Sequence, residues 1–152
     1  MRWRDVDFET GTLHRPNPKG GEERAFTIPL SRFALGLLRF RQRQNALLFP
    51  GSEWVFPTRL RDRSVTHIKE PKELRRGLPS PHRLRDTYHT ACQEAGLSPY
   101  DIDVLTNHRP PRGSVSAGYI RQSLDHLREC QERVTEHLLG RIVNRRAAVL
   151  EG

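Results

Sequence analysis

Apolar and polar positions alternate over short stretches in the first thirty residues, a pattern typical of β-strands. Strands are expected at residues 3–8, 12–15 and 25–30. The Glu-Thr-Gly segment at 9–11 has the composition of a turn, and the Pro- and Gly-rich segment 16–21 that of a loop. The pattern therefore predicts a small three-stranded antiparallel sheet at the start of the chain.

Helical spacing replaces this alternation from Ser31 onward. Ser31 is expected to begin a helix whose apolar side carries Phe33, Leu37, Leu38 and Phe40. The segment 54–57 has the character of a buried extended anchor, and a modest helix is expected from Ser64 through Leu74. Further helices are expected at 81–95, at 99–105 and beyond residue 119. The fold class predicted is α+β, mainly α, with the small sheet followed by a helical bundle.

The helix expected at 81–95 begins with a cluster of groups suited to an anion. Ser80 is a good N-cap, Pro81 suits the first helical position, and His82 and Arg85 stand three residues apart on one face. Unpaired backbone N–H groups, the helix dipole, an imidazole and a guanidinium together favour an oxyanion such as phosphate.

Two apolar stripes are expected to pack the helices. The first consists of Leu84, Tyr88, Ala91 and Ala95. The second runs along a long amphipathic helix and consists of Ile120, Leu124, Leu127, Val134, Leu138 and Ile142. Because the second stripe is longer than a compact half-domain covers, we expect it to pack back on the chain or, preferably, to mediate self-association.

Composition is consistent with a nucleic-acid partner. The chain has 152 residues, enough for one domain, with 26 Lys and Arg against 18 Asp and Glu and a formal net charge of +8. Most of the positive charge is arginine, whose planar guanidinium binds phosphate at two points. The alternative, a basic protein with solvated charge runs, remains open on composition alone.

Cysteine usage and hydropathy point to a reducing compartment. Cys92 and Cys130 are too few for a disulfide framework, and no His/Cys group has zinc-ligand spacing, so no metal or other cofactor is expected. No signal peptide and no run of membrane-spanning length is visible. We expect a cytoplasmic protein without a membrane partner.

Four residues occur in an order that is more specific than any of them alone. His82 and Arg85 form His-x-x-Arg, His108 follows about two dozen residues later, and Tyr119 lies in an Ala-Gly-Tyr-Ile segment. This set resembles the catalytic domain of the tyrosine recombinases, the phage integrase family. The Lys-Gly-Gly-Glu-Glu-Arg segment that contains Lys19, followed by a strand ending Ile-Pro-Leu, also looks like this family.

The resemblance implies a chemical role for each residue. Tyr119 would attack a scissile phosphate of double-stranded DNA and form a 3′-phosphotyrosyl link. Arg85 would hold the non-bridging oxygens and His108 would hydrogen-bond the phosphate. His82 would assist proton transfer, and Lys19 would protonate the 5′-oxygen. No cofactor is needed for such site-specific recombination.

The sequence departs from the family pattern in two places. The link from His108 to Tyr119 is lengthened by a segment at 109–113. The family also uses a first arginine just before the strand that this chain has at residues 2–7, and that arginine is absent. We therefore expect residues 1–152 to be a partial catalytic domain without its first part and without the N-terminal DNA-binding domain, and inactive alone.

Two other functions fit the same residues. One is a DNA-binding integrase remnant that has lost catalysis, although the presence of all five site residues argues against long decay. The other is a ribonuclease that uses His82 and His108 as an acid–base pair. The reaction product distinguishes the three functions. A recombinase leaves a covalent protein–DNA adduct, a binding remnant leaves no product, and a ribonuclease leaves cleaved RNA.

Overall fold

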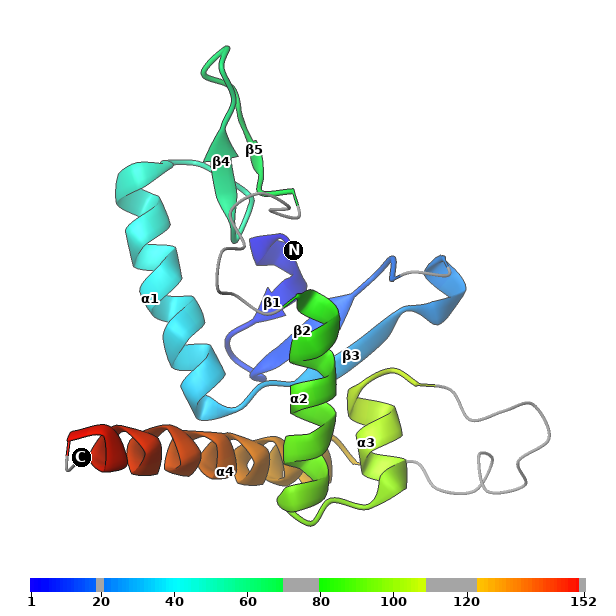
Figure 1. Cartoon of the computed structure of the whole chain (residues 1–152). Helices are drawn as coiled ribbons and strands as arrows, with labels where there is room; N and C mark the ends of the chain where they lie inside the picture. Colours follow the sequence, from blue (N-terminus) through cyan, green and yellow to red (C-terminus); the bar gives the residue numbers. More distant parts are fainter. Residues whose placement is uncertain (19–20, 70–79, 109–122, 151–152) are drawn as a thin grey trace. The chain divides into compact units, whose positions relative to one another are not determined.

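The chain forms two compact units, Met1–Leu78 and Pro79–Gly152 (Figure 1). The computed structural model describes residues 1–18, 21–69, 80–108 and 123–150, and each unit is described by itself. Within these residues it shows a mixed fold with a three-stranded antiparallel sheet and four α-helices, which confirms the predicted fold class. None of the described helices is both long enough and apolar enough to span a bilayer.

The first unit contains the predicted sheet. Strands β1 (Val6–Asp7), β2 (Thr12–Arg15) and β3 (Phe26–Pro29) pair in the order β1-β2-β3, all antiparallel. A 3₁₀ turn, η2 (Glu22–Arg24), precedes β3. The third strand lies inside its predicted limits, and the second matches them.

The first strand is shorter than predicted. Residues Trp3–Asp5 form a 3₁₀ turn, η1, because the carboxylate of Asp5 accepts a hydrogen bond of 2.7 Å from the backbone N–H of Arg2. Phe8 lies in the turn that follows β1. At the end of this turn Gly11 has φ +66°, a value that favours glycine, and a Cβ there would lie 3.2 Å from Leu35.

Helix α1 (Arg32–Leu48) begins where the sequence predicts. The side chain of Ser31 caps it by accepting a hydrogen bond from the N–H of Ala34. Near its other end, the buried amide of Asn45 donates to the carbonyl oxygens of Trp54 and Val55 at 3.1 and 3.0 Å. A polar side chain therefore joins α1 to the extended anchor, in which Val55 is fully buried.

The apolar side predicted for α1 is not its packed side. Phe33, Leu37 and Phe40 are 48%, 54% and 59% exposed, whereas Leu38 is half-buried. The hydrogen bonds that join α1 to the anchor come instead from the polar side chains of Asn45 and Arg41.

The predicted helix from Ser64 was also wrong. Strands β4 (Pro57–Arg59) and β5 (Val65–His67) form an antiparallel hairpin. Arg63 adopts φ +65°, and the carboxylate of Asp62 accepts hydrogen bonds from the N–H and the hydroxyl of Ser64. This local turn reverses the chain where a helix would continue it; residues 70–74 of the predicted helix lie outside the described residues.

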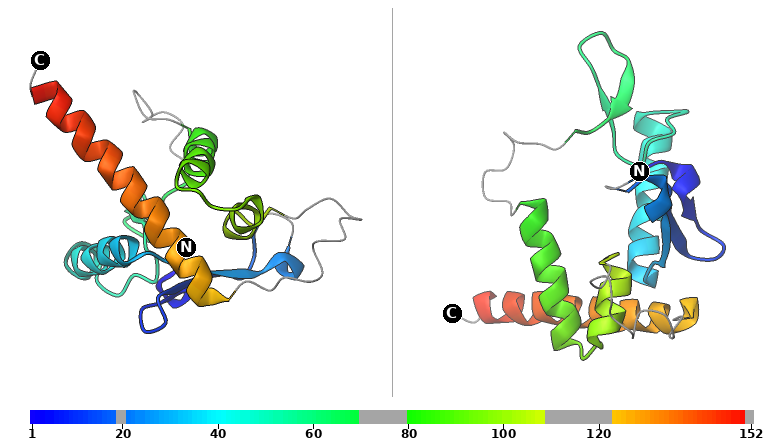
Figure 2. Two further views of the ribbon diagram at one scale, coloured as in Figure 1. Left: turned by 90° about the horizontal axis from the view of Figure 1, so that it is seen from below. Right: turned by 90° about the vertical axis from the view of Figure 1, so that its right-hand side faces the viewer.

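The described part of the second unit contains three helices, α2 (Pro81–Glu94), α3 (Pro99–Leu105) and α4 (Leu124–Leu150). Ser80 and Ser98 are the N-caps of α2 and α3, and a proline follows each of them at the first helical position. Helix α2 crosses α4 steeply in both Figure 1 and the right-hand view of Figure 2. The core of this unit consists of Ala91, Cys92, Leu97, Ile102, Leu105, Leu127, Cys130 and Val134.

The two predicted stripes are buried only in part. On α2, Ala91 is buried and Tyr88 half-buried, but Leu84 is 54% exposed, since only the second half of α2 contributes to the core. On α4, Leu127 and Val134 are buried, whereas the stripe residues nearer the helix ends, Leu124 and Ile142, are exposed; Ile120 lies outside the described residues. The second stripe therefore packs in its middle within its own unit.

Candidate functional site

The beginning of α2 presents the predicted histidine and arginine to the surface. The hydroxyl of Ser80 accepts a hydrogen bond of 3.3 Å from the N–H of Arg83, which sets the first turn of the helix. His82 and Arg85 follow on successive turns and both are exposed. The exposed positions fit groups that contact a ligand rather than groups that fill the core.

Arg85 reaches from α2 to the end of α3. Its Nη2 donates a hydrogen bond of 2.8 Å to the carbonyl oxygen of Thr106, the C-cap residue of α3. Carbonyl groups at a helix C-terminus carry partial negative charge and attract cations. The contact fixes the guanidinium at this end of α3, while its other N–H groups have no acceptor among the described residues.

His108 follows directly at the same end of α3. Asn107 adopts φ +51°, a left-handed conformation that asparagine tolerates better than most residues, and it turns the chain there. The N–H of His108 donates to the carbonyl oxygen of Asp103 at 2.7 Å, and its Nδ1 lies 3.6 Å from the carboxylate of Asp103. The imidazole remains 72% exposed. The structure thus places Arg85 and His108 at one end of one short helix, although they are far apart in the sequence.

Lys19 and Tyr119, the other two predicted site residues, lie outside the described residues. Lys19 belongs to the first unit and Tyr119 to the second. Their roles therefore remain predictions.

Tyr88 is excluded as a nucleophile by its surroundings. It packs against the core of the second unit, and its hydroxyl donates a hydrogen bond of 2.9 Å to Oε1 of Gln131. Burial raises the pKa of the Tyr88 phenol, which disfavours the phenolate. A nucleophilic tyrosine needs the opposite environment, one that favours the phenolate.

A groove of the second unit lies on another face of α2. It has a volume of about 470 Å³ and runs between α2 and α4, with Arg83 and Asp86 on one side and Leu138 and Arg141 on the other. None of the predicted site residues lines it. Arg83 and Arg85 therefore lie on different faces of the same helix, the first towards α4 and the second towards α3.

Two residues of this site were missed by the sequence analysis. Thr106 orients Arg85 through its backbone carbonyl, a contact that no side-chain motif reveals. Asp103 bonds His108, and its position five residues before that histidine was a signal available in the sequence. The described residues also contain one group of possible metal ligands, Asp101, His126 and Cys130, which includes none of the predicted site residues.

Comparison with known proteins assigns the family. A sequence profile of the phage integrase family matches residues 1–123. Tyrosine recombinase XerA of Pyrococcus furiosus is 30% identical over 145 residues, which cover 92% of this chain and 50% of that protein. Prophage integrase IntA of Escherichia coli is 28% identical over 112 residues, covering 70% of this chain and 26% of that protein. The chain thus spans at most about half the length of these relatives, and no solved structure is significantly similar to it. Because the profile covers most of the sequence, the chain belongs to the phage integrase family.

Proposed function

We propose that this chain is part of an enzyme of site-specific DNA recombination that cleaves and rejoins DNA through a 3′-phosphotyrosyl intermediate. The observation that carries the proposal is the meeting of Arg85 and His108 at the C-terminal end of α3 in a chain of the phage integrase family. A phosphodiester requires charge neutralisation, an aligned nucleophile and protonation of the leaving oxygen.

Arg85 and the two histidines would provide the groups that hold the phosphate. With one N–H engaged by Thr106, the guanidinium of Arg85 still has donors for two non-bridging oxygens. The exposed imidazole of His108 would donate a further hydrogen bond. His82, one turn before Arg85 on α2, would assist proton transfer and orientation.

Tyr119 and Lys19 would perform the covalent and proton-transfer steps. The Tyr119 phenol gives up its proton with the assistance of His82, and its oxygen attacks phosphorus to form the phosphotyrosyl bond. The bond from phosphorus to the 5′-oxygen breaks, and Lys19 supplies that oxygen with a proton. In the reverse direction a 5′-hydroxyl attacks the phosphotyrosine and the DNA is rejoined. These assignments rest on the family pattern together with the exclusion of Tyr88.

We further propose that the 152 residues alone bind DNA weakly and without sequence preference, and do not cleave it. They contain one of the two arginines of the family pattern, and removing one donor to a developing oxyanion costs about 10²- to 10³-fold in rate. Phosphate contacts release counterions, so salt should weaken this binding steeply.

A nicked suicide substrate tests the proposal. The chain alone should bind this DNA at low salt and give no covalent product. Free guanidinium, at a concentration far below that which unfolds the protein, offers the planar donors of the absent arginine and should allow a covalent band to form. Tyr119→Phe should abolish the band and Tyr88→Phe should not. A band that survives Tyr119→Phe, or no DNA binding at low salt, would contradict the proposal.

The same reactions examine the two alternative functions. Cleaved RNA without attached protein, lost in His82→Ala and His108→Ala, would indicate the ribonuclease. DNA binding without any adduct in the presence of guanidinium would indicate the binding remnant.

We also propose that α4 contributes to self-association. Ile142 and Val143 lie beyond the part of α4 that packs in its own unit and are 58% and 64% exposed. Light scattering over a dilution series should show dissociation on dilution, and Ile142→Glu should leave a monomer at all concentrations. A wild-type chain that is monomeric throughout would refute this proposal.

A further inference from the structure

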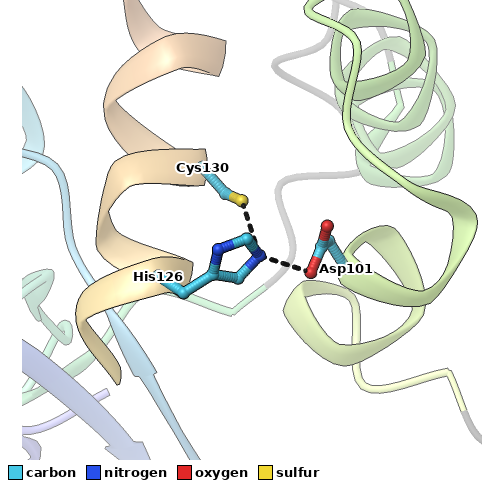
Figure 3. Close-up of side chains that lie close together, drawn as sticks. All are labelled: Asp101, His126 and Cys130. Atoms are coloured by element: carbon cyan, nitrogen blue, oxygen red, sulfur yellow. Dashed lines mark hydrogen bonds and ion pairs between the residues drawn. The ribbon is translucent and has the colours of Figure 1, made fainter. Parts of the chain in front are cut away.

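Three side chains with metal-binding atoms meet where α3 contacts α4 (Figure 3). Asp101 lies in the first turn of α3, and His126 and Cys130 lie one turn apart on α4. One carboxylate oxygen, one imidazole nitrogen and the sulfur all lie within 4.8 Å of one another. Asp101 and Cys130 are buried, at 5% and 1% exposure.

The contacts among the three converge on one atom. Nε2 of His126 lies 2.9 Å from Oδ1 of Asp101 and 3.6 Å from Sγ of Cys130. A proton relay of the Cys-His-Asp kind uses one ring nitrogen for the acid and the other for the thiol. Here both partners face the same nitrogen, so the geometry does not fit a relay.

Hydrogen bonding through Nε2 of His126 can join it to only one of its two neighbours at a time. A ring nitrogen has either one hydrogen or one lone pair. With a hydrogen on Nε2, the nitrogen donates to Asp101 and the thiol of Cys130 loses it as an acceptor. With a lone pair on Nε2, the thiol of Cys130 can donate to this nitrogen. The carboxylate of Asp101 then faces a nitrogen that has no hydrogen to donate to it. A cation at the point of convergence would satisfy all three groups together.

Two of the three ligand separations are close to those of a tetrahedral zinc ion, and the third, from Sγ of Cys130 to the carboxylate of Asp101, is no more than 4.8 Å. Bond lengths of about 2.0–2.1 Å to nitrogen or oxygen and about 2.3 Å to sulfur give ligand separations of about 3.6 Å for S···N and about 3.3 Å for N···O. The Cys130–His126 separation of 3.6 Å already has the first value. The His126–Asp101 separation of 2.9 Å must open by only about 0.4 Å.

The ligands are also held in place by their surroundings. The hydroxyl of Ser98 donates to Oδ2 of Asp101 at 2.6 Å, which orients the carboxylate in the way that outer partners orient zinc ligands. The side chain of His126 is 44% exposed, which leaves a path for the ion and a water molecule. The sequence analysis found no zinc motif because Asp101 lies 25 residues before His126 and comes from another helix.

We propose that Asp101, His126 and Cys130 bind Zn²⁺, with water in the fourth position. Sulfur, imidazole and carboxylate together suit zinc better than Mg²⁺ or Ca²⁺, which prefer oxygen ligands. The thiol of Cys130 gives up its proton to solvent, His126 binds as the neutral ring through Nε2, and Asp101 binds as the carboxylate. The ion joins α3 to the beginning of α4, which starts five residues after Tyr119 in the sequence. This site does not depend on the proposed recombinase function.

Cobalt(II) provides the spectroscopic test, because a bound thiolate gives a charge-transfer absorption that oxygen and nitrogen ligands do not. One equivalent of Co²⁺ should produce this band in the wild-type chain, and Zn²⁺ should remove it. Cys130→Ser should lose the band. The matched control is Cys92→Ser, which changes the other buried thiol of the same core and should keep the band.

Two milder variants keep the test decisive if Cys130→Ser fails to fold. His126→Gln changes a partly exposed side chain, and isosteric Asp101→Asn keeps the oxygen that accepts from Ser98. Each should weaken Zn²⁺ binding at least about 100-fold, the upper end of the loss seen when only an outer partner is removed. Zn²⁺ should raise the Tm of the wild-type chain and of Cys92→Ser but not of these variants. No Zn²⁺ or Co²⁺ uptake by the wild-type chain, or a cobalt band that survives Cys130→Ser, would overturn the proposal.

Discussion

Replacing Arg85 by alanine tests whether the side chain that reaches α3 also contacts DNA. In the structure one N–H of its guanidinium is engaged by Thr106, and the others face no acceptor among the described residues. Arg85→Ala should therefore remove one phosphate contact. Arg83→Ala is the matched control, because it removes the same charge from the same helix on the face towards α4.

The expected magnitude follows from counterion release. Each phosphate contact adds about 0.9 to the slope of log K against log salt concentration for double-stranded DNA. Between roughly 50 and 200 mM salt, a fourfold change, one contact is worth about 3.5-fold in affinity. The affinity ratio of the wild-type chain to Arg85→Ala should fall by this factor over the range, independently of DNA sequence.

Fluorescence anisotropy with a labelled duplex of arbitrary sequence measures both slopes. The wild-type chain and Arg83→Ala should have slopes equal within error, and Arg85→Ala should have a slope smaller by about 0.9. Thermal unfolding of each variant checks that the second unit remains folded. Equal slopes for Arg83→Ala and Arg85→Ala would show that only net charge matters and would refute the assignment of Arg85 to a phosphate.

Three further predictions concern stability. Tyr88→Phe should lower the free energy of unfolding by about 0.5–1.5 kcal/mol through loss of its hydrogen bond, measured by urea denaturation; an unchanged value would contradict a structural role for the hydroxyl. Val134→Ala, which truncates a side chain only 1% exposed, should cost about 2 kcal/mol with an unchanged m-value; a cost near zero would contradict its burial. Hydrogen bonds, first from His137 and also from Arg141, hold the pKa of Glu94 below its usual value, so the carboxylate contributes stability above its unfolded pKa of about 4.5. That contribution is lost as the pH falls through the lower folded pKa, and unfolding curves of Glu94→Gln between about pH 3 and 7 should lack this part of the acid dependence.

Signals that lie within a few residues were predictive. Ser31, Ser80 and Ser98 each stand at a helix start, and the prediction of helices after them is confirmed. A capping hydroxyl and a proline in the first turn act on the nearest backbone groups only, so neighbouring sequence is enough to recognise them. The second strand, 12–15, was equally local, since its turn and its alternation are both visible in the sequence.

Predictions of which apolar side chains are buried were less successful, because burial depends on the element that packs against them. One local prediction failed as well: the helix expected from Ser64 is a hairpin strand, because Asp62 and the left-handed Arg63 reverse the chain before it. The apolar side of α1, including Phe33, is largely exposed. Leu84 has the right spacing for the stripe of α2 but lies before the part of the helix that meets the core.

The sequence by itself determined the fold class, the starts of α1, α2 and α3, and the ordered set of His82, Arg85, His108 and Tyr119, which points to the phage integrase family. Only the tertiary structure decided that Arg85 bonds the carbonyl at the end of α3, and that Asp101 lies beside His126 and Cys130 of α4. The physical reason is the distance along the chain over which each kind of interaction acts. Capping and dihedral preferences act within one turn of chain, whereas a contact between helices depends on which faces pack, and many apolar faces of similar pattern compete for the same partners.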